Sequence, residues 1–188
     1  MKKRLEEMSN EELWQLFPIE LKKPQFEWKS WYEEESALLR RFLPSDHIKR
    51  ISHVGSTSVK TIWAKPIVDI LAEMTPEGSR DVLKELLLQH GYRCMSQDEK
   101  RMSFNKGYTE EGFAQKVFHL HLRYPGDNDE LYFRDFLIDH PETAEEYERL
   151  KLSLGKSFQY DRDAYTEAKT GFIVRCTRKA RELYGSRY

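Results

Sequence analysis

Cysteine and long apolar runs are both scarce in this sequence. Its two cysteines, Cys94 and Cys176, lie far apart, which argues against a disulfide framework or a cysteine-based metal site. No apolar run approaches the ~20 residues that a membrane-spanning helix needs. Residues 1–7 are basic, but no apolar stretch follows them, so we expect no signal peptide and a reducing, cytoplasmic location.

A bias toward charge of one sign is absent as well. The formal net charge is -1, so no field over the whole chain favours nucleic acid or an anionic membrane, and we expect neither partner. Apolar residues make up 39% and aromatic residues 13%, which is typical of a folded globular protein. A length of 188 residues favours one domain spanning residues 1–188.

The order of predicted elements favours an α+β fold. Ser9 and Glu12 form a capping-box pattern that begins a helix. Thr75-Pro76 places a proline at the first position of another helix, which ends before Gly91. The pattern predicts helices at 9–17, 24–42 and 75–90, strands at 48–54, 67–74, 92–96, 101–106 and 116–124, a hairpin loop at 107–112, and helices from 129 onward with breaks near 140–141 and 155. This order predicts a small mixed β-sheet flanked by helices.

A glycine-serine turn within residues 53–58, His-Val-Gly-Ser-Thr-Ser, indicates a phosphate site. Gly55 can adopt backbone angles that other residues avoid, which lets a phosphate approach the main chain. Ser56 and Thr57 supply hydroxyl groups beside it. Asp69 follows on a predicted strand and offers hard oxygen ligands to a divalent cation, so we expect Mg²⁺ or Mn²⁺.

Asp69 lies in an apolar strand, where a carboxylate is costly to bury unless it is paired or binds a metal. Residues 69, 71 and 73 share one face of this strand, while residues 68, 70 and 72 suit a core. In the purely structural alternative, Asp69 pairs with Lys65 or with a histidine. In the functional alternative, it is a catalytic and metal-binding residue.

The acidic motif around Asp69 is incomplete. Leu71 occupies the position where a second carboxylate is expected. Glu73 lies one strand step beyond the position of the expected second carboxylate, and it is one alternative source of a second oxygen. We expect its side chain to be exposed. Asp98 and Glu99, which precede the middle strand, are other sources of that carboxylate.

The motif Phe118-His-Leu-His-Leu122 carries paired histidines. His119 and His121 point to the same face of the predicted strand, and two imidazoles at this spacing can share a metal or flank a phosphate. The alternative is two hydrogen-bonded histidines on a partly exposed sheet face. His53 ends the strand that enters the turn, and it converges with Asp69, His119 and His121 if the strands are neighbours. We predict Asp69, His119 and His121 as catalytic and metal-binding residues, with His53 as an additional candidate.

Three further cations are weaker candidates. Lys65 precedes Asp69 and can reach a phosphate, or it is an ordinary loop lysine. Arg134 and Lys169 lie on predicted helices among aromatic residues. Either neutralises the charge of an anionic substrate or makes an ion pair on a helix surface.

Taken in order, these motifs resemble those of the GrpB family of the nucleotidyltransferase superfamily. The resemblance covers nearly the whole chain and rests on the motifs at residues 53–59, 64–70, 118–122, 132–136 and 165–173. It implies a nucleotidyltransferase-like fold and a Gly-Ser motif followed by paired acids. Only Gly55, Ser56 and Asp69 carry over from that motif. The family generally has this single-carboxylate form and the paired histidines, whereas Lys60-Thr61 replaces the Pro-Gly of many relatives.

Three functions follow from these residues. In a metal-dependent nucleotidyl- or phosphotransferase, Ser56 and the turn amides bind phosphates, while Asp69 with a histidine or Glu73 places Mg²⁺ or Mn²⁺. A module that binds a nucleotide, a small anion or a protein without any transfer accounts for Leu71 directly. Histidine-centred phosphoester hydrolysis or metal binding is the third. We favour a nucleotidyltransferase-like protein that binds a nucleotide or another phosphorylated small molecule.

Overall fold

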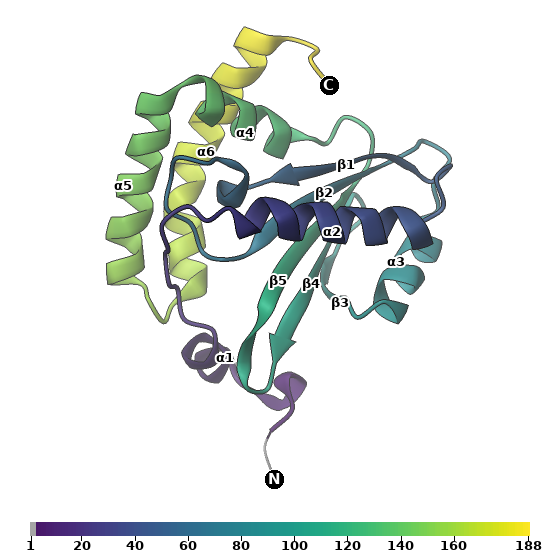
Figure 1. Cartoon of the computed structure of the whole chain (residues 1–188), viewed down its shortest axis with the longest axis horizontal. Helices are drawn as coiled ribbons and strands as arrows, with labels where there is room; N and C mark the ends of the chain where they lie inside the picture. Colours follow the sequence, from purple (N-terminus) through teal and green to yellow (C-terminus); the bar gives the residue numbers. More distant parts are fainter. Residues whose placement is uncertain (1–2) are drawn as a thin grey trace.

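The computed structural model describes residues 3–188. Helices and strands alternate irregularly along the chain (Figure 1). The elements are η1 (Leu5–Glu7), α1 (Asn10–Leu16), α2 (Glu27–Phe42), β1 (Ile48–Val54), η2 (Ser56–Ser58), β2 (Val68–Met74), α3 (Arg80–Gln89), β3 (Arg93–Gln97), β4 (Arg101–Thr109), β5 (Gly112–Arg123), α4 (Asp129–Asp139), α5 (Pro141–Ser157) and α6 (Arg162–Tyr184).

The five strands form one mixed sheet in the order β1-β2-β5-β4-β3. β2 and β5 run parallel, whereas the other neighbouring strands run antiparallel. A parallel pair needs a crossover connection, which α3 and the β3–β4 hairpin supply here. The predicted α+β class, with a small mixed sheet flanked by helices, is therefore confirmed (Figure 1).

One face of the sheet is covered by α2, which crosses it in Figure 1. Trp28 and Leu39 of α2 are almost fully buried in one cluster with Ile70 of β2 and Leu120 of β5. Successive side chains of a strand point to opposite faces of the sheet, so Ile70 and Leu120 face α2 while their neighbours in β2 and β5 face the other way. The opposite face of β2 and β5 carries Asp69, His119 and His121 together with Leu71.

A second apolar cluster joins the helices α4, α5 and α6 to the segment after the turn. Tyr132, Tyr147 and Cys176 belong to this cluster, and Val59 and Ile62 connect it to the turn. Leu71 is fully buried against Val54 and Leu131, so α4 covers this part of β2. The three C-terminal helices are thus held beside the edge of the sheet that carries the glycine-serine turn.

Glu73 was predicted to be exposed, and this prediction is wrong, because its side chain is 0% exposed. Its carboxylate accepts hydrogen bonds from Arg50, from Lys49 Nζ at 3.2 Å and from the Gly126 amide at 3.0 Å. Burial alone would raise the pKa of Glu73, but the Gly126 amide and the Arg50 and Lys49 side chains outweigh it and lower that pKa. The lone pairs of Glu73 are therefore used within the fold.

Two predicted boundaries differ from the structure near prolines and glycines. α3 begins at Arg80 and not at Pro76, because the Ser79 hydroxyl caps it by accepting a hydrogen bond from the Val82 amide. Gly155 lies inside α5, and the break comes after it, near Phe158. These differences leave the order of the elements unchanged.

The predicted hairpin loop at 107–112 is much shorter in the structure. β4 continues to Thr109 and β5 begins at Gly112, so Tyr108 pairs with Phe113. The Thr109 hydroxyl donates to the Gly112 carbonyl at 2.9 Å, which closes the turn. The extra strand length brings Tyr108 beside His119, with ring centroids 5.9 Å apart.

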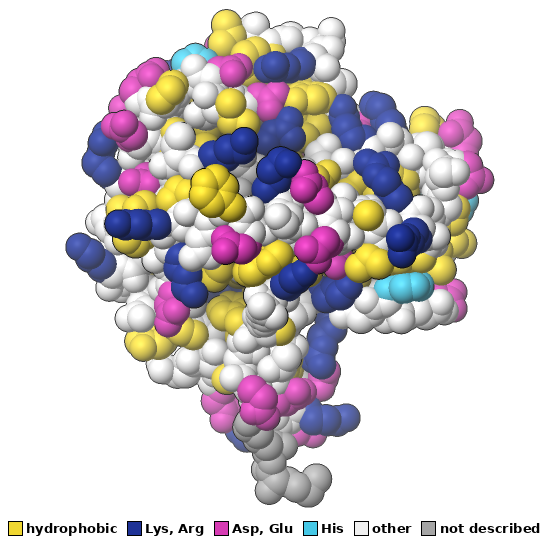
Figure 2. Space-filling view, viewed as in Figure 1, with side chains coloured by type: hydrophobic (Ala, Val, Ile, Leu, Met, Phe, Trp, Pro, Cys, Tyr) yellow, Lys and Arg dark blue, Asp and Glu magenta, His cyan; other side chains and the backbone are white. Residues whose placement is uncertain are grey.

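The face that carries α2 shows Lys and Arg mixed with Asp and Glu and no large area of one sign (Figure 2).

Among residues 3–188, no helix combines the length and apolarity needed to cross a membrane.

Candidate functional site

A cavity of about 770 Å³ opens between the polar face of the sheet, the glycine-serine turn and the helices α5 and α6. Seven of the predicted site residues line it. These are Gly55, Ser56, Thr57, Lys65, Asp69, His119 and Lys169.

Strand register brings Asp69 and the paired histidines together. Asp69 pairs with His119 across the parallel β2–β5 ladder, and Leu71 pairs with His121. His119 Nδ1 lies 3.3 Å and His121 Nε2 lies 3.6 Å from the same oxygen, Asp69 Oδ1. The predicted convergence of these three side chains is therefore present.

Neighbouring groups define which nitrogen of each imidazole carries a proton. Arg123 can only donate, and its Nη2 lies 3.2 Å from His121 Nδ1, so His121 Nε2 carries the proton that faces Asp69. At His119, the Tyr108 hydroxyl lies 2.8 Å from Nε2, and Arg162 also approaches this nitrogen, at 3.4 Å. His119 Nε2 therefore accepts, while Nδ1–H is directed at Asp69.

The electrostatics of this group keep Asp69 charged. Burial opposes the carboxylate charge, but the two imidazoles outweigh it and hold the pKa of Asp69 well below its usual range. Burial lowers the pKa of His119 to about 4, although Asp69 opposes this shift. At neutral pH, His119 is therefore neutral and stabilises the Asp69 anion through its N–H group.

Gly55 is needed for Asp69 to occupy this position. A Cβ at Gly55 would lie 2.2 Å from Asp69 Oδ2, and the backbone angle φ of Gly55 is 69°. Side-chain residues rarely adopt such an angle. The close approach that we predicted for a phosphate at Gly55 is thus made by the carboxylate of Asp69.

Four cations lie near Asp69. Lys65, Lys151, Lys169 and Arg162 all line the cavity. The lining of the cavity as a whole contains seven basic side chains and four carboxylates, which are Asp69, Asp129, Glu130 and Glu182. Burial, followed by repulsion from neighbouring cations, lowers the pKa of Lys65 and Lys151 to about 7. Burial also lowers the pKa of Lys169 to about 8, with Asp69 opposing and Arg162 adding to the shift. The cavity therefore has more basic side chains than its four carboxylates can balance.

Two of these cations were missed in the sequence. Lys151 is 2% exposed and donates to Ser56 Oγ at 2.9 Å and to the Trp63 carbonyl. The sequence contained a signal for Lys151, because Ala144, Tyr147 and Lys151 have the spacing of one helix face. In the structure this face of α5 is buried, so the lysine points inward. Arg162 is the first residue of α6, and no local pattern marked it.

His53 does not join the group around Asp69, so the predicted four-residue convergence is wrong in this respect. His53 pairs with Ile70, whose side chain faces α2, and its ring stacks on Tyr32 at 4.7 Å between centroids. His53 Nε2 lies 3.0 Å from the Thr57 hydroxyl. Burial lowers the pKa of His53 to about 4. His53 therefore supports the turn from the opposite face of the sheet.

Arg134 makes contacts within the fold and is not part of the cavity lining. Its guanidinium donates to Asp135 at 2.8 Å, to the His53 carbonyl at 3.0 Å and to the Tyr188 hydroxyl at 2.8 Å. Of the two predicted roles, the structure supports the ion pair. Arg134 thus joins α4 and the C-terminal residues to the end of β1.

The donor set fits a divalent cation poorly. The N–H groups of His119 and His121 face Asp69, so their lone pairs do not point to a shared position. Asp98 and Glu99 lie in another cavity with Arg101 and Asp127 and supply no second carboxylate. Within residues 3–188, no three His, Cys, Asp or Glu side chains are arranged to hold a metal ion. The surrounding lysines favour an anion instead.

Comparison with known proteins identifies relatives over most of the chain. Residues 18–179 match the family model described as GrpB protein. The Glutamate-rich protein GrpB of Alkalihalophilus pseudofirmus is 36% identical over 154 residues, covering 78% of this chain and 86% of that protein. A UPF0157 protein of Pseudomonas aeruginosa is 33% identical over 156 residues, covering 81% of this chain and 64% of that protein.

A solved structure also resembles this fold. The crystal structure of the conserved protein GrpB from Enterococcus faecalis matches with a TM-score of 0.76 and 26% identity, covering 88% of this chain and 99% of that chain. Cid1 poly(U) polymerase matches more loosely, with a TM-score of 0.45 and 14% identity over 68% of this chain and 41% of that chain, which does not bear on activity. The family model, the relatives and the motifs agree that the chain belongs to the GrpB family.

Proposed function

We propose that this protein binds a phosphate-bearing small molecule, with a nucleotide as the leading class, in the cavity around Asp69. The observation that supports this proposal is the excess of cations in the cavity lining, where seven basic side chains face four carboxylates. Lys65, Lys151, Lys169 and Arg162 are the cations near Asp69. Burying lysines against one another is costly unless an anion balances them. A cytoplasmic location, where phosphorylated metabolites are abundant, is part of this proposal.

Phosphate is the anion that best fits these groups. Lysine ammonium groups bind phosphate as point charges, and the Arg162 guanidinium can bind two phosphate oxygens at once. The Ser56 hydroxyl accepts a hydrogen bond from Lys151 and keeps its own proton to donate to a phosphate oxygen. A chain of phosphates has enough oxygens to contact several of these cations together.

Transfer of a nucleotidyl group is a further step of the proposal. It would need Mg²⁺ or Mn²⁺ at Asp69, where the protein side chains fit a divalent cation poorly, so the cation would have to draw most of its ligands from the phosphates and water. Binding without transfer explains Leu71 and the surplus of lysines with no added ligand. Histidine-centred hydrolysis has less support, because both ring nitrogens of His119 already face polar partners.

A thermal-shift screen followed by titration calorimetry tests the binding. The ligands are tripolyphosphate, ATP, GTP, CTP and UTP, each with and without Mg²⁺ or Mn²⁺. We expect a stabilising shift with at least one phosphate compound, and roughly tenfold weaker binding for Lys169→Ala, since losing one charge-assisted hydrogen bond costs about 1.5–3 kcal/mol. Lys179→Ala is the matched control, because Lys179 is exposed on the same helix and absent from the cavity lining.

The two forms of the proposal give different results in Asp69→Asn. A nucleotide shift that needs both a divalent cation and Asp69 supports nucleotidyl transfer. A shift that is independent of metal and survives Asp69→Asn supports binding without transfer. If none of the phosphate compounds binds the folded protein, phosphate binding is wrong.

A further inference from the structure

A second cavity of about 760 Å³ lies beside the first, between the sheet and the N-terminal helices. His119 and Arg162 line both cavities. We propose that the two cavities form one bipartite site, in which the first binds the phosphates of a ligand and the second binds a heteroaromatic ring of the same ligand. This inference rests on the proposed phosphate binding and deepens it by assigning the rest of the ligand.

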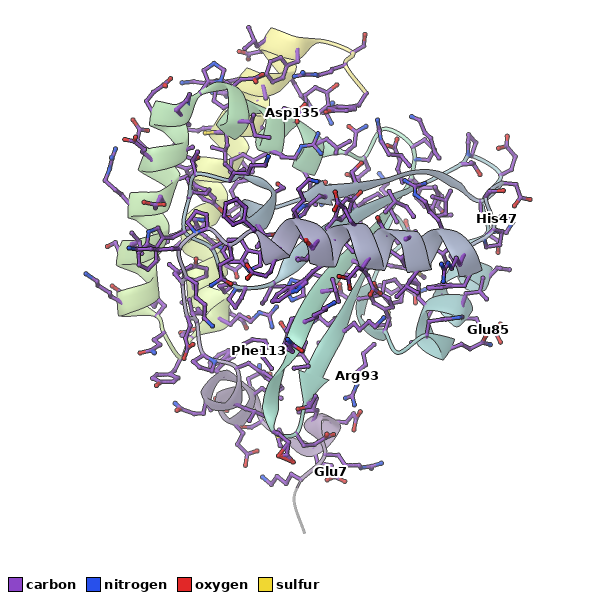
Figure 3. The ribbon with its side chains drawn as sticks, viewed as in Figure 1. Glu7, His47, Glu85, Arg93, Phe113 and Asp135 are labelled. Atoms are coloured by element: carbon purple, nitrogen blue, oxygen red, sulfur yellow. The ribbon has the colours of Figure 1, made fainter. Side chains whose placement is uncertain are left out.

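A row of polar residues connects the two cavities across the sheet. Asp69 of β2 pairs with His119 of β5, His119 pairs with Asn105 of β4, and Asn105 pairs with Arg93 of β3. Directly paired residues project from the same face of a sheet. The row thus leads from the carboxylate in the first cavity to Asn105 in the second. Arg93 lies near the end of the sheet beside the N-terminal segment (Figure 3) and donates to Glu6 at 3.0 Å.

Asn105 is the residue that points to a ligand in the second cavity. It is 7% exposed and lines this cavity. Among the contacts described for residues 3–188, no hydrogen bond is made by its side chain. Its amide atoms are not among the fully buried polar atoms that lack a partner, so they are accessible from the cavity. The amide offers both a donor and an acceptor in one plane. The edge of a heteroaromatic ring that carries a donor beside an acceptor complements such an amide.

Aromatic side chains supply the walls that a ring would stack against. Trp14 is half-buried, and Phe17 and Tyr108 lie with their ring centroids 4.7 Å apart. All three line the second cavity. Flat rings gain from offset or tilted contacts with such side chains. The second cavity therefore places aromatic walls and the Asn105 amide in one lining.

Arg162 lies at the boundary between the two cavities. Its position favours one ligand that spans both cavities over two separate ligands. Its guanidinium lies 5.7 Å from the Tyr108 ring centroid, and its Nη2 lies 3.4 Å from His119 Nε2. A guanidinium in this position can contact a phosphate on one side while it flanks a ring on the other. A molecule with phosphates attached to a heteroaromatic group, as in a nucleotide, spans both cavities.

Paired titrations of tripolyphosphate and of ATP, GTP, CTP and UTP test this assignment. We expect at least one nucleotide to bind wild-type protein more tightly than tripolyphosphate does. Asn105→Ala should weaken that nucleotide about tenfold and leave tripolyphosphate within about twofold, because the amide contacts only the ring. Lys169→Ala should weaken both ligands. Asn105→Leu, which keeps a similar shape without a hydrogen-bonding group or a charge, provides a second variant if Asn105→Ala does not fold.

Three results would overturn the bipartite site. The first is equal affinity of wild-type protein for tripolyphosphate and for every nucleotide. The second is an Asn105 variant that weakens tripolyphosphate as much as the nucleotide. The third is a nucleotide affinity that does not change in the variant, which would assign the second cavity to a separate molecule. Failure of tripolyphosphate and all nucleotides to bind would instead contradict phosphate binding itself.

Discussion

A Cβ on Gly55 would lie 2.2 Å from the Oδ2 atom of Asp69, so the carboxylate at the centre of the cavity depends on the absence of a side chain one strand away. Val54, which precedes Gly55, pairs with Asp69 across β1 and β2. The turn and the carboxylate therefore form one unit. A change in either is transmitted to the other.

Gly55→Ala should destabilise the protein and abolish phosphate binding. The backbone angles of Gly55, φ 69° and ψ -174°, belong to a region that costs a side-chain residue about 1–3 kcal/mol, and the clash with Asp69 adds to this. Chemical denaturation and calorimetry measure the two effects. Gly185→Ala is the control, since Gly185 has a φ of 56° and open space around its Cβ position. Equal loss of stability in both variants would contradict the role of the Asp69 clash.

Lys151→Met should weaken binding of tripolyphosphate while the fold remains intact. Methionine keeps the length of the buried stem but removes the ammonium group that contacts Ser56. Loss of that charge should reduce affinity about tenfold, since a charge-assisted hydrogen bond contributes about 1.5–3 kcal/mol. Lys156→Met, on an exposed position of the same helix, is expected to bind as the wild type does. Unchanged affinity in Lys151→Met would remove Lys151 from the site.

Affinity for phosphate should fall as the pH rises from about 6 to about 9. The pKa values of Lys65 and Lys151 are lowered to about 7 and that of Lys169 to about 8, so these lysines lose their protons over this range in the free protein. A bound anion raises those pKa values, and binding near pH 8 then takes up protons. Calorimetry in buffers of different ionisation enthalpy measures this uptake, and proton release would contradict it.

The same lysines affect the stability of the protein without ligand. Their pKa values are near 10.4 in the unfolded chain, so the unfolded state binds more protons than the folded state above pH 7. Their contribution to the free energy of unfolding should therefore increase as the pH rises from about 7 to about 10. Chemical denaturation of wild-type protein and of Lys151→Met at several pH values checks the sign. The free energy of unfolding should rise less with pH in Lys151→Met than in the wild type. A steeper rise in the variant would contradict the lowered pKa of Lys151.

Glu73→Gln should destabilise the protein. The fraction that remains folded should bind phosphate with the affinity of the wild type. Removing the charge leaves Arg50 without its carboxylate partner, and breaking a buried ion pair costs about 3–5 kcal/mol. Glu33→Gln is the control, because the Glu33–Lys29 pair is exposed and such pairs contribute less than about 1 kcal/mol. Weaker binding in a Glu73→Gln protein that is fully folded would return Glu73 to the candidate site.

The parts of this protein that could be predicted from the sequence depend on short stretches of chain. The capping box of Ser9 and Glu12 is present as predicted, because both of its hydrogen bonds form within one turn of α1. The bounds of β1 agree because alternating side chains determine a strand locally. The period of a strand likewise placed His119 and His121 on one face before their neighbours were known.

Contacts between distant segments decided the rest. The spacing of Gly55, Asp69 and the paired histidines along the chain was enough to predict that they belong to one site. Only the tertiary structure showed that α4 buries Leu71, that His53 faces α2, and that α5 and α6 carry Lys151 and Arg162 into the cavity. The physical reason is that strand period specifies which face a side chain occupies, whereas packing between helices and sheet decides what covers that face.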